Sequence, residues 1–183
     1  FCQPVVRLKD QKPVHREVLA RIRDEDGRYI LPGNFIELAE SLGLIQEIDL
    51  RVVEKLLAFM SDSRQIGKKL RYFVNLSRVS ISDQRWIKRF LALLRDSGVN
   101  PGQLVFEITE TAAMSEIDVT LTFIRQLKDM GCRFALDDFG AGFSSFYYLK
   151  RFEVDYLKID GSFIRDLATD EGSRIFVKAL NDV

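Results

Sequence analysis

The chain has 183 residues, which fits a single domain, and 46% of them are hydrophobic, enough for one buried core. This composition excludes a largely disordered protein. The 27 basic and 27 acidic residues give a formal net charge of zero, so no overall field would attract the chain to a DNA or RNA polymer or to an anionic membrane surface.

Two short strands are predicted near the N-terminus, over residues 1–8 and 15–22, with the polar turn KDQKP between them. Pro32 suits the first turn of a helix that ends at Gly43. Apolar residues at helical spacing predict a further helix over residues 45–60. The first third of the chain therefore carries two strands and two helices.

From residue 71 onwards, strands and helices alternate. Strands are predicted over residues 71–77, 104–109, 133–138 and 155–160, and helices over residues 86–95, 119–130 and 172–180. Alternation of this kind indicates parallel strands joined by right-handed crossovers, and hence an α/β barrel or a doubly wound sheet.

The number of strands bears on the completeness of the barrel. We count about six strands, whereas a closed eight-stranded barrel takes about 250 residues. An open six-stranded barrel would leave unpaired strand edges, and the sequence stops at Val183 within a helical pattern. We therefore expect the C-terminal part of the barrel to be missing from this chain.

Most of the predicted strands carry polar groups at or near their C-terminal ends. In RFALDD the apolar run stops at Asp137 and Asp138, and two neighbouring carboxylates in mid-strand would place one of them in the core. The corresponding groups of the other strands are Glu17, Asn75, Glu107 with Glu110, and Lys158 with Asp160. Because the C-terminal ends of parallel strands converge in an α/β barrel, these side chains are predicted to share one site.

The chemistry of these side chains indicates a hard cation. Carboxylate and amide oxygens suit Mg²⁺, Mn²⁺ or Ca²⁺ rather than zinc or copper. The adjacent pair Asp137 and Asp138 would allow one carboxylate to bridge two ions, as in two-metal phosphodiester chemistry. Lys158 could orient a water or carry part of the charge. Each residue alone has a plainer interpretation, as a solvated loop start or an Asp-Asp-Gly turn; their convergence favours a site.

Other residue types exclude competing sites. Cys2 and Cys132 match no metal or redox spacing, and the single His15 excludes most histidine-based zinc sites. Two distant cysteines favour buried thiols in a reducing compartment. No apolar run approaches the roughly 20 residues needed to cross a bilayer, and no signal-peptide pattern is present. We expect a cytoplasmic domain, with any inner-membrane anchor elsewhere in a longer parent protein.

Taken together, FCQPVV, EVLAR, LPGNFIELAE, YFVNLS, FEITE, DDFGAGFSS and DYLKIDGSFI resemble the EAL domain family, the cyclic di-GMP phosphodiesterases. The resemblance covers residues 1–183, with the motifs in the family's order. It implies a modified TIM (β/α)8 barrel whose first strand is antiparallel, and hydrolysis of cyclic di-GMP to linear pGpG with two Mg²⁺ or Mn²⁺ ions. It also implies inhibition by Ca²⁺, a homodimer, and fusion to sensor or GGDEF domains.

The resemblance assigns roles to the residues at the strand ends. The first ion's ligands are Glu17, Asn75, Glu107 and Asp137; the second ion is bound by Asp137 and Asp138, in a region supported by Asp160. Two further residues serve the reaction: Lys158 positions or deprotonates the attacking water, and Glu110 organises the loop after the aspartate pair. The family dimerises through the barrel face that bears this loop, near Phe143.

The same resemblance predicts contacts with the nucleotide. These fall on Gln3, Leu19, Arg21, Pro32 and Phe35, with Arg21 near a phosphate. Three positions depart from the family's usual residues, namely Val18 for Ala, Ala141 for Thr and Phe143 for Tyr. The family's later glutamate and glutamine lie beyond Val183. Two alternatives to the enzyme stay open, a receptor that binds cyclic di-GMP without hydrolysing it and a scaffold that uses the barrel surface alone.

Overall fold

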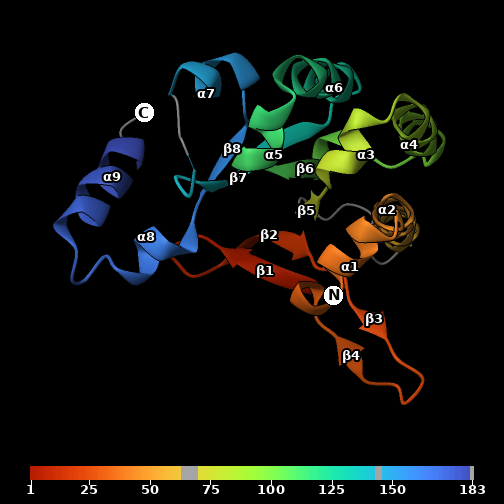
Figure 1. Cartoon of the computed structure of the whole chain (residues 1–183), viewed down its shortest axis with the longest axis horizontal. Helices are drawn as coiled ribbons and strands as arrows, with labels where there is room; N and C mark the ends of the chain where they lie inside the picture. The colour runs from red at the N-terminus through yellow and green to blue at the C-terminus, as the bar shows by residue number, and fades with distance from the viewer. Residues whose placement is uncertain (63–69, 143–145, 182–183) are drawn as a thin grey trace.

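The computed structural model describes residues 1–62, 70–142 and 146–181, without the side chains of residues 146–148. A six-stranded sheet in the order β1-β2-β5-β6-β7-β8 curls into a half-barrel (Figure 1). Its strands are β1 (Cys2–Val6), β2 (Pro13–Val18), β5 (Arg71–Asn75), β6 (Leu104–Thr109), β7 (Arg133–Phe139) and β8 (Tyr156–Ile159). β1 is antiparallel to β2 and all later pairs are parallel. The predicted partial barrel with an antiparallel first strand is confirmed.

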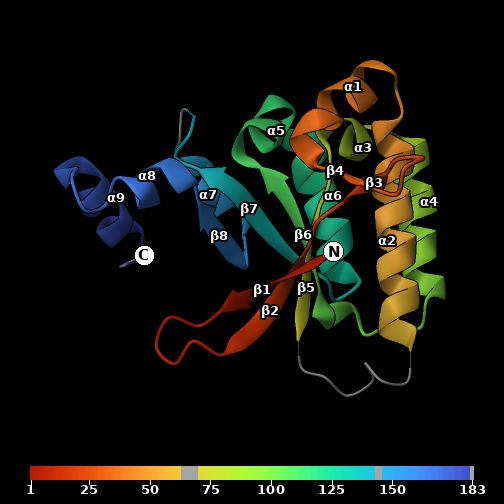
Figure 2. The same ribbon diagram turned by 90° about the horizontal axis from the view of Figure 1, so that it is seen from below.

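The helices form two groups around this sheet. One group lies in an arc outside the curl and consists of α2 (Ile45–Ser61), α4 (Gln84–Asp96), α6 (Ile117–Asp129) and α7 (Phe146–Phe152) (Figure 1). Three short helices lie at the end towards which the parallel strands run, namely α1 (Ile36–Ser41), α3 (Arg78–Ser82) and α5 (Glu110–Ser115) (Figure 2). The chain then continues through α8 (Gly161–Arg165) and α9 (Glu171–Asn181). In the described part of the chain, no helix has the length and apolar character to cross a membrane.

All six predicted strands and the long predicted helices are present, but short elements escaped the sequence analysis. These are the hairpin β3 (Ile22–Arg23) and β4 (Tyr29–Ile30), the 3-10 turns η1 (Pro32–Asn34) and η2 (Pro101–Gln103), and helices α3, α5, α7 and α8. Pro32 begins a 3-10 turn, and the α-helix starts only at Ile36. Elements of two to seven residues carry too little periodicity to detect, although Ser77, Thr109 and Asp160 do cap α3, α5 and α8.

The core lies between the convex face of the sheet and the outer helices. Phe106 of β6 packs edge-on against Phe90 of α4, with ring centroids 5.1 Å apart, and Phe90 stacks on Trp86 at 4.8 Å. The concave face carries a smaller apolar cluster, made of Phe73, Val105, Ala135 and Tyr156. Because side chains alternate along a strand, the residue that follows Phe106 in β6 points to the concave side. That residue is Glu107.

Candidate active site

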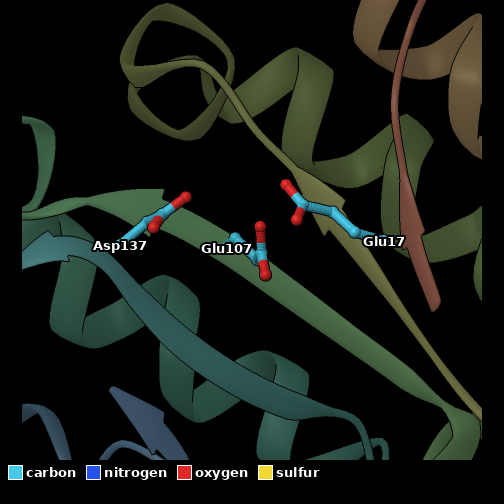
Figure 3. A group of neighbouring side chains, drawn as sticks. All are labelled: Glu17, Glu107 and Asp137. Carbon is cyan, nitrogen blue, oxygen red and sulfur yellow. The ribbon is translucent and has the colours of Figure 1, made fainter. Parts of the chain in front are cut away.

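Three carboxylates from three strands meet on the concave face. Glu17 of β2, Glu107 of β6 and Asp137 of β7 each place one oxygen within 4.8 Å of the oxygens of the other two. Figure 3 shows these side chains directed towards one another across the sheet. The register is consistent with this meeting, since Glu107 lies opposite Ala135 of β7, and Asp137, two residues further along, is on the same face of the sheet. The predicted convergence of distant strand ends is confirmed.

Lys158 of β8 joins the same cluster. Its Nζ donates hydrogen bonds to Asp137 Oδ2 at 2.8 Å, to Glu107 Oε2 at 2.9 Å and to Glu17 Oε1 at 3.3 Å. Burial acts to lower the pKa of Lys158, but the carboxylates of Glu107 and Asp137 outweigh it and raise that pKa above its usual value. The protonated ammonium therefore offsets part of the negative charge of the cluster.

Glu107 is the carboxylate of the cluster whose charged form is most disfavoured by burial. Its side chain is 0% exposed, and this burial raises its pKa to about 7, against the opposing influence of Lys158. Its Oε1 atom has no hydrogen-bond partner among the residues that the structure describes. An unsatisfied buried acceptor costs about 1–3 kcal/mol. A buried hard oxygen without a partner, beside two other carboxylates, fits a ligand of a divalent cation.

The other predicted metal ligands lie around this centre. Asn75 Nδ2 donates to Glu17 Oε1 at 3.4 Å, so the amide adjoins the cluster. Asp138 is exposed, with a φ of 53°, and lies outside the three-carboxylate group. Although the residue as a whole is exposed, partial loss of hydration around its carboxyl group and the charge of Asp137 raise its pKa. Asp160 caps α8, because its Oδ1 accepts from the amide of Ser162 at 2.8 Å. The second ion's predicted ligands are thus less closely gathered than the first ion's.

Glu110 holds the loop that follows the aspartate pair. It is the first residue of α5, its side chain is buried, and its Oε2 accepts a hydrogen bond from the amide of Gly140 at 3.0 Å. Gly140 has a φ of 99°, and a Cβ there would lie 2.7 Å from Phe163 Cε2 and 2.9 Å from the ring of Phe176. This contact agrees with the loop-organising role predicted for Glu110. Phe143, at the predicted dimer face, lies outside the described residues.

The predicted substrate residues divide into two groups. Leu19 and Arg21 line a pocket of about 290 Å³ together with Phe1 and Tyr29, and the Arg21 guanidinium lies 5.7 Å from the centroid of the Phe1 ring. The others are not among the residues that line this pocket: Gln3 pairs with Glu17 across β1 and β2, Pro32 begins η1, and Phe35 is 6% exposed. Two of the five predicted residues therefore line this pocket.

One buried carboxylate near the site was missed by the sequence analysis. Asp49 of α2 is 7% exposed and accepts a hydrogen bond from the amide of Ser77, two residues after Asn75. A signal was present, because Asp49 lies four residues after Ile45 and four before Val53 on the buried face of the helix. An acidic residue in an apolar helical stripe is informative because its burial must be compensated.

A curled sheet of mainly parallel strands, with carboxylates gathered at their C-terminal ends, defines an α/β-barrel protein with an acidic site. The family described as "EAL domain" matches residues 1–183. The chain therefore belongs to the EAL domain family.

Two curated relatives and one solved structure illustrate the similarity. The cyclic di-GMP phosphodiesterase PdeB of Shewanella oneidensis is 37% identical over 185 residues, which cover 100% of this chain and 22% of that protein. The cyclic di-GMP phosphodiesterase PdeF of Escherichia coli K12 is 34% identical over 170 residues, which cover 93% of this chain and 22% of that protein. The structure described as "PaMucR Phosphodiesterase, c-di-GMP complex" superposes with a TM-score of 0.86 at 32% identity, covering 97% of this chain and 72% of that one. The chain spans about a fifth of the length of these curated relatives.

Proposed function

We propose that this domain is a phosphodiesterase that hydrolyses cyclic di-GMP to linear pGpG with Mg²⁺ or Mn²⁺. The observation that carries the proposal is the meeting of Glu17, Glu107 and Asp137 within 4.8 Å, with an unpartnered oxygen on the most buried of them among the described residues. The relatives PdeB and PdeF, which are named as cyclic di-GMP phosphodiesterases, support the choice of substrate.

The residues around the cluster would hold two cations. Glu17, Asn75, Glu107 and Asp137 would bind the first ion, and Asp137 with Asp138 would bind the second, next to Asp160. Bound divalent cations supply an activated water and neutralise charge on a phosphoryl group. Hard oxygen donors of this kind select Mg²⁺ or Mn²⁺ over softer metals.

The protein's own groups would position the reactants. Lys158 directs its ammonium at three carboxylate oxygens, so it is placed to orient the attacking water beside the same cluster. Glu110 would fix the loop after Asp137 and Asp138 through the amide of Gly140. Because the chain has no net charge, a phosphate of the substrate must be held locally, and we assign that contact to Arg21.

Substrate recognition and assembly are further parts of the proposal. Leu19 and Arg21 would contact the nucleotide from the pocket near Phe1, with Gln3, Pro32 and Phe35 contributing from β1 and the segment after β4. The cytoplasmic location, the homodimer and the fused sensor or GGDEF domains also stay predictions. Cys132 is buried as predicted, whereas Cys2 is exposed, so the prediction of two buried thiols is wrong for Cys2.

A chromatographic assay tests the function. The full-length protein, supplied with Mg²⁺ or Mn²⁺ and cyclic di-GMP, is expected to produce pGpG, and chelation with EDTA or the substitution Glu17→Ala is expected to abolish the product. Ca²⁺ in place of Mg²⁺ should inhibit the reaction. Nucleotide that is bound but never linearised would identify a receptor, and an absence of nucleotide binding would identify a scaffold.

A further inference from the structure

Asp49 is a buried carboxylate in the layer of helices outside the sheet. Its Oδ2 accepts hydrogen bonds from the amide of Ser77 at 2.9 Å and from the hydroxyl of Ser80 at 2.6 Å. Ser80 is 0% exposed and Asp49 is 7% exposed, so the hydrogen bond between them is shielded from solvent, whereas the one from the Ser77 amide is partly buried. A carboxylate in such a position is tolerated only when hydrogen bonds compensate for its lost hydration. The two bonds show what Asp49 holds, namely the start of helix α3.

The held segment begins with a predicted metal ligand. Asn75 is the last residue of β5, and the amide of the next residue, Leu76, donates to the backbone carbonyl of Glu107 at 2.9 Å. The amide after that belongs to Ser77 and is the one that Asp49 accepts. Two consecutive amides after Asn75 are therefore fixed, the first by strand β6 and the second by helix α2.

Ser77 and Ser80 add further hydrogen bonds at the start of α3. Ser77 Oγ accepts from the amide of Ser80 at 3.2 Å as the helix N-cap, and it donates to Ser80 Oγ at 2.9 Å. The Ser80 hydroxyl in turn donates to Asp49. Asp49 is thus the terminal acceptor of this small network, since each hydroxyl proton is directed towards it in sequence.

We propose that Asp49 is a positioning residue, which holds the backbone after Asn75 so that the Asn75 amide stays beside Glu17 at the cation site. This inference rests on the metal site of the proposed function. Metal ligands act within narrow distance limits, and residues behind the ligands typically change metal affinity by about 10- to 100-fold when they are removed. Without Asp49, the amide of Ser77 and the hydroxyl of Ser80 lose a buried acceptor and the segment must rearrange to find another.

If Asp49 only stabilised the fold, its removal would lower the melting temperature without changing the Mn²⁺ affinity of the folded protein. A control variant that destabilises the fold away from Asn75 separates this role from positioning. Leu94 of α4 is 5% exposed, and it lies in the last turn of its helix, before the chain enters β6 at Leu104. It is therefore close to the end of the sheet opposite the carboxylates. Leu94→Ala should destabilise the fold through a core cavity without disturbing Asn75.

The test measures Mn²⁺ affinity in the full-length protein by titration, with free Mn²⁺ followed by electron paramagnetic resonance. We expect Asp49→Ala to weaken Mn²⁺ binding about 10- to 100-fold, while Leu94→Ala leaves the affinity of the folded protein unchanged despite its lower melting temperature. Ser80→Ala, which removes one of the two hydrogen bonds, should give a smaller loss. If Asp49→Ala does not fold, Ser80→Ala provides the measurement, because it removes one of the two hydrogen bonds and leaves Asp49 in place.

A double-mutant cycle then asks whether Asp49 acts through Asn75. Combining Asp49→Ala with Asn75→Ala should weaken Mn²⁺ binding no more than Asn75→Ala alone. Once the Asn75 side chain is removed, Asp49 has no ligand left to position. Wild-type affinity in both Asp49→Ala and Ser80→Ala, or fully additive losses in the double variant, would overturn the inference. Failure of the wild-type protein to bind Mn²⁺ would instead overturn the proposed metal site, and this inference with it.

Discussion

The two faces of strand β6 carry equally buried side chains, one of which packs in the apolar core while the other belongs to the carboxylate cluster. Phe106 and Glu107 are neighbours and both are 0% exposed. Phe106 points outward and packs edge-on against Phe90 of α4, which also contacts Phe123 of α6, so it contributes to stability by packing. Glu107 points inward, where burial raises its pKa and one oxygen lacks a partner among the described residues. The outer face stabilises the half-barrel through packing. The inner face carries a buried carboxylate whose charge a bound cation would stabilise.

Polar groups on the two sides differ in the same way. In the outer layer, the buried Asp49 accepts two hydrogen bonds from Ser77 and Ser80. At the site, the single ammonium group of Lys158 donates hydrogen bonds to three carboxylates. A satisfied buried group indicates a structural or positioning role, whereas a crowded or unsatisfied one indicates chemistry. Substitutions on each side should therefore separate stability from activity.

The largest effect is expected from Glu107→Gln on the inner face. The loss of a charged ligand should reduce Mn²⁺ affinity and turnover by more than about 100-fold. The metal-free protein should keep its melting temperature at pH 8 or gain stability, because a buried charge has been replaced by a neutral group of the same shape. Thermal unfolding in EDTA, alongside pGpG production, measures both. A large fall in melting temperature would contradict the contrast between the faces.

Lys158→Met should come next in magnitude. We expect turnover to fall about 10²- to 10⁴-fold, with a much smaller change in nucleotide affinity, since the ammonium acts on the reacting groups. The metal-free protein should also lose stability, because three neighbouring carboxylates lose their shared cation. Lys178→Met, an exposed position on α9, is the control. Comparable losses of turnover and of nucleotide affinity would argue against this role.

Phe106→Ala tests the outer face of the same strand. Removal of this fully buried ring should lower the free energy of unfolding by about 3–5 kcal/mol, through lost contacts and a residual cavity. Mn²⁺ affinity of the folded fraction should stay near the wild-type value, because the carboxylates lie on the other side of the sheet. Urea denaturation and Mn²⁺ titration give the two numbers. Weakened metal binding by fully folded Phe106→Ala protein would show that the faces are coupled.

The smallest expected effect is a pH dependence due to Asp49. Burial raises its pKa above the usual 3.8, although hydrogen bonds from Ser80 and Ser77 act to lower it. The folded protein therefore holds this proton more tightly than the unfolded chain does. The stabilising contribution is complete below about pH 4 and is lost as the pH rises through the raised pKa.

Asp49→Asn removes this titration. The free energy of unfolding of the wild type, relative to the variant, should therefore decline between about pH 4 and neutrality. Urea denaturation across this range measures the difference. A difference that stays constant, or grows with pH, would mean that the pKa of Asp49 is not raised in the folded protein.

Much of the architecture was accessible from local patterns. Strand–helix alternation predicted the parallel half-barrel, and apolar periodicity located α2, α4 and α6 to within two residues at each end. The rule that parallel strands converge at their C-terminal ends predicted that Glu17, Glu107 and Asp137 share one site. These features depend on residue order and on backbone geometry that is the same in every such fold.

The tertiary structure alone decided which groups touch and at what electrostatic cost. Lys158 and Glu17 are 141 residues apart in sequence, yet their side chains are hydrogen-bonded, and no local pattern encodes that pairing. Three other features are likewise invisible in the sequence pattern. They are the raised pKa of Glu107, the capping of α8 by Asp160 and the hydrogen bond from the Ser77 amide to Asp49. The physical reason is that burial and hydrogen-bond partners are set by neighbours in space, whereas sequence periodicity reports only which face of an element a side chain occupies.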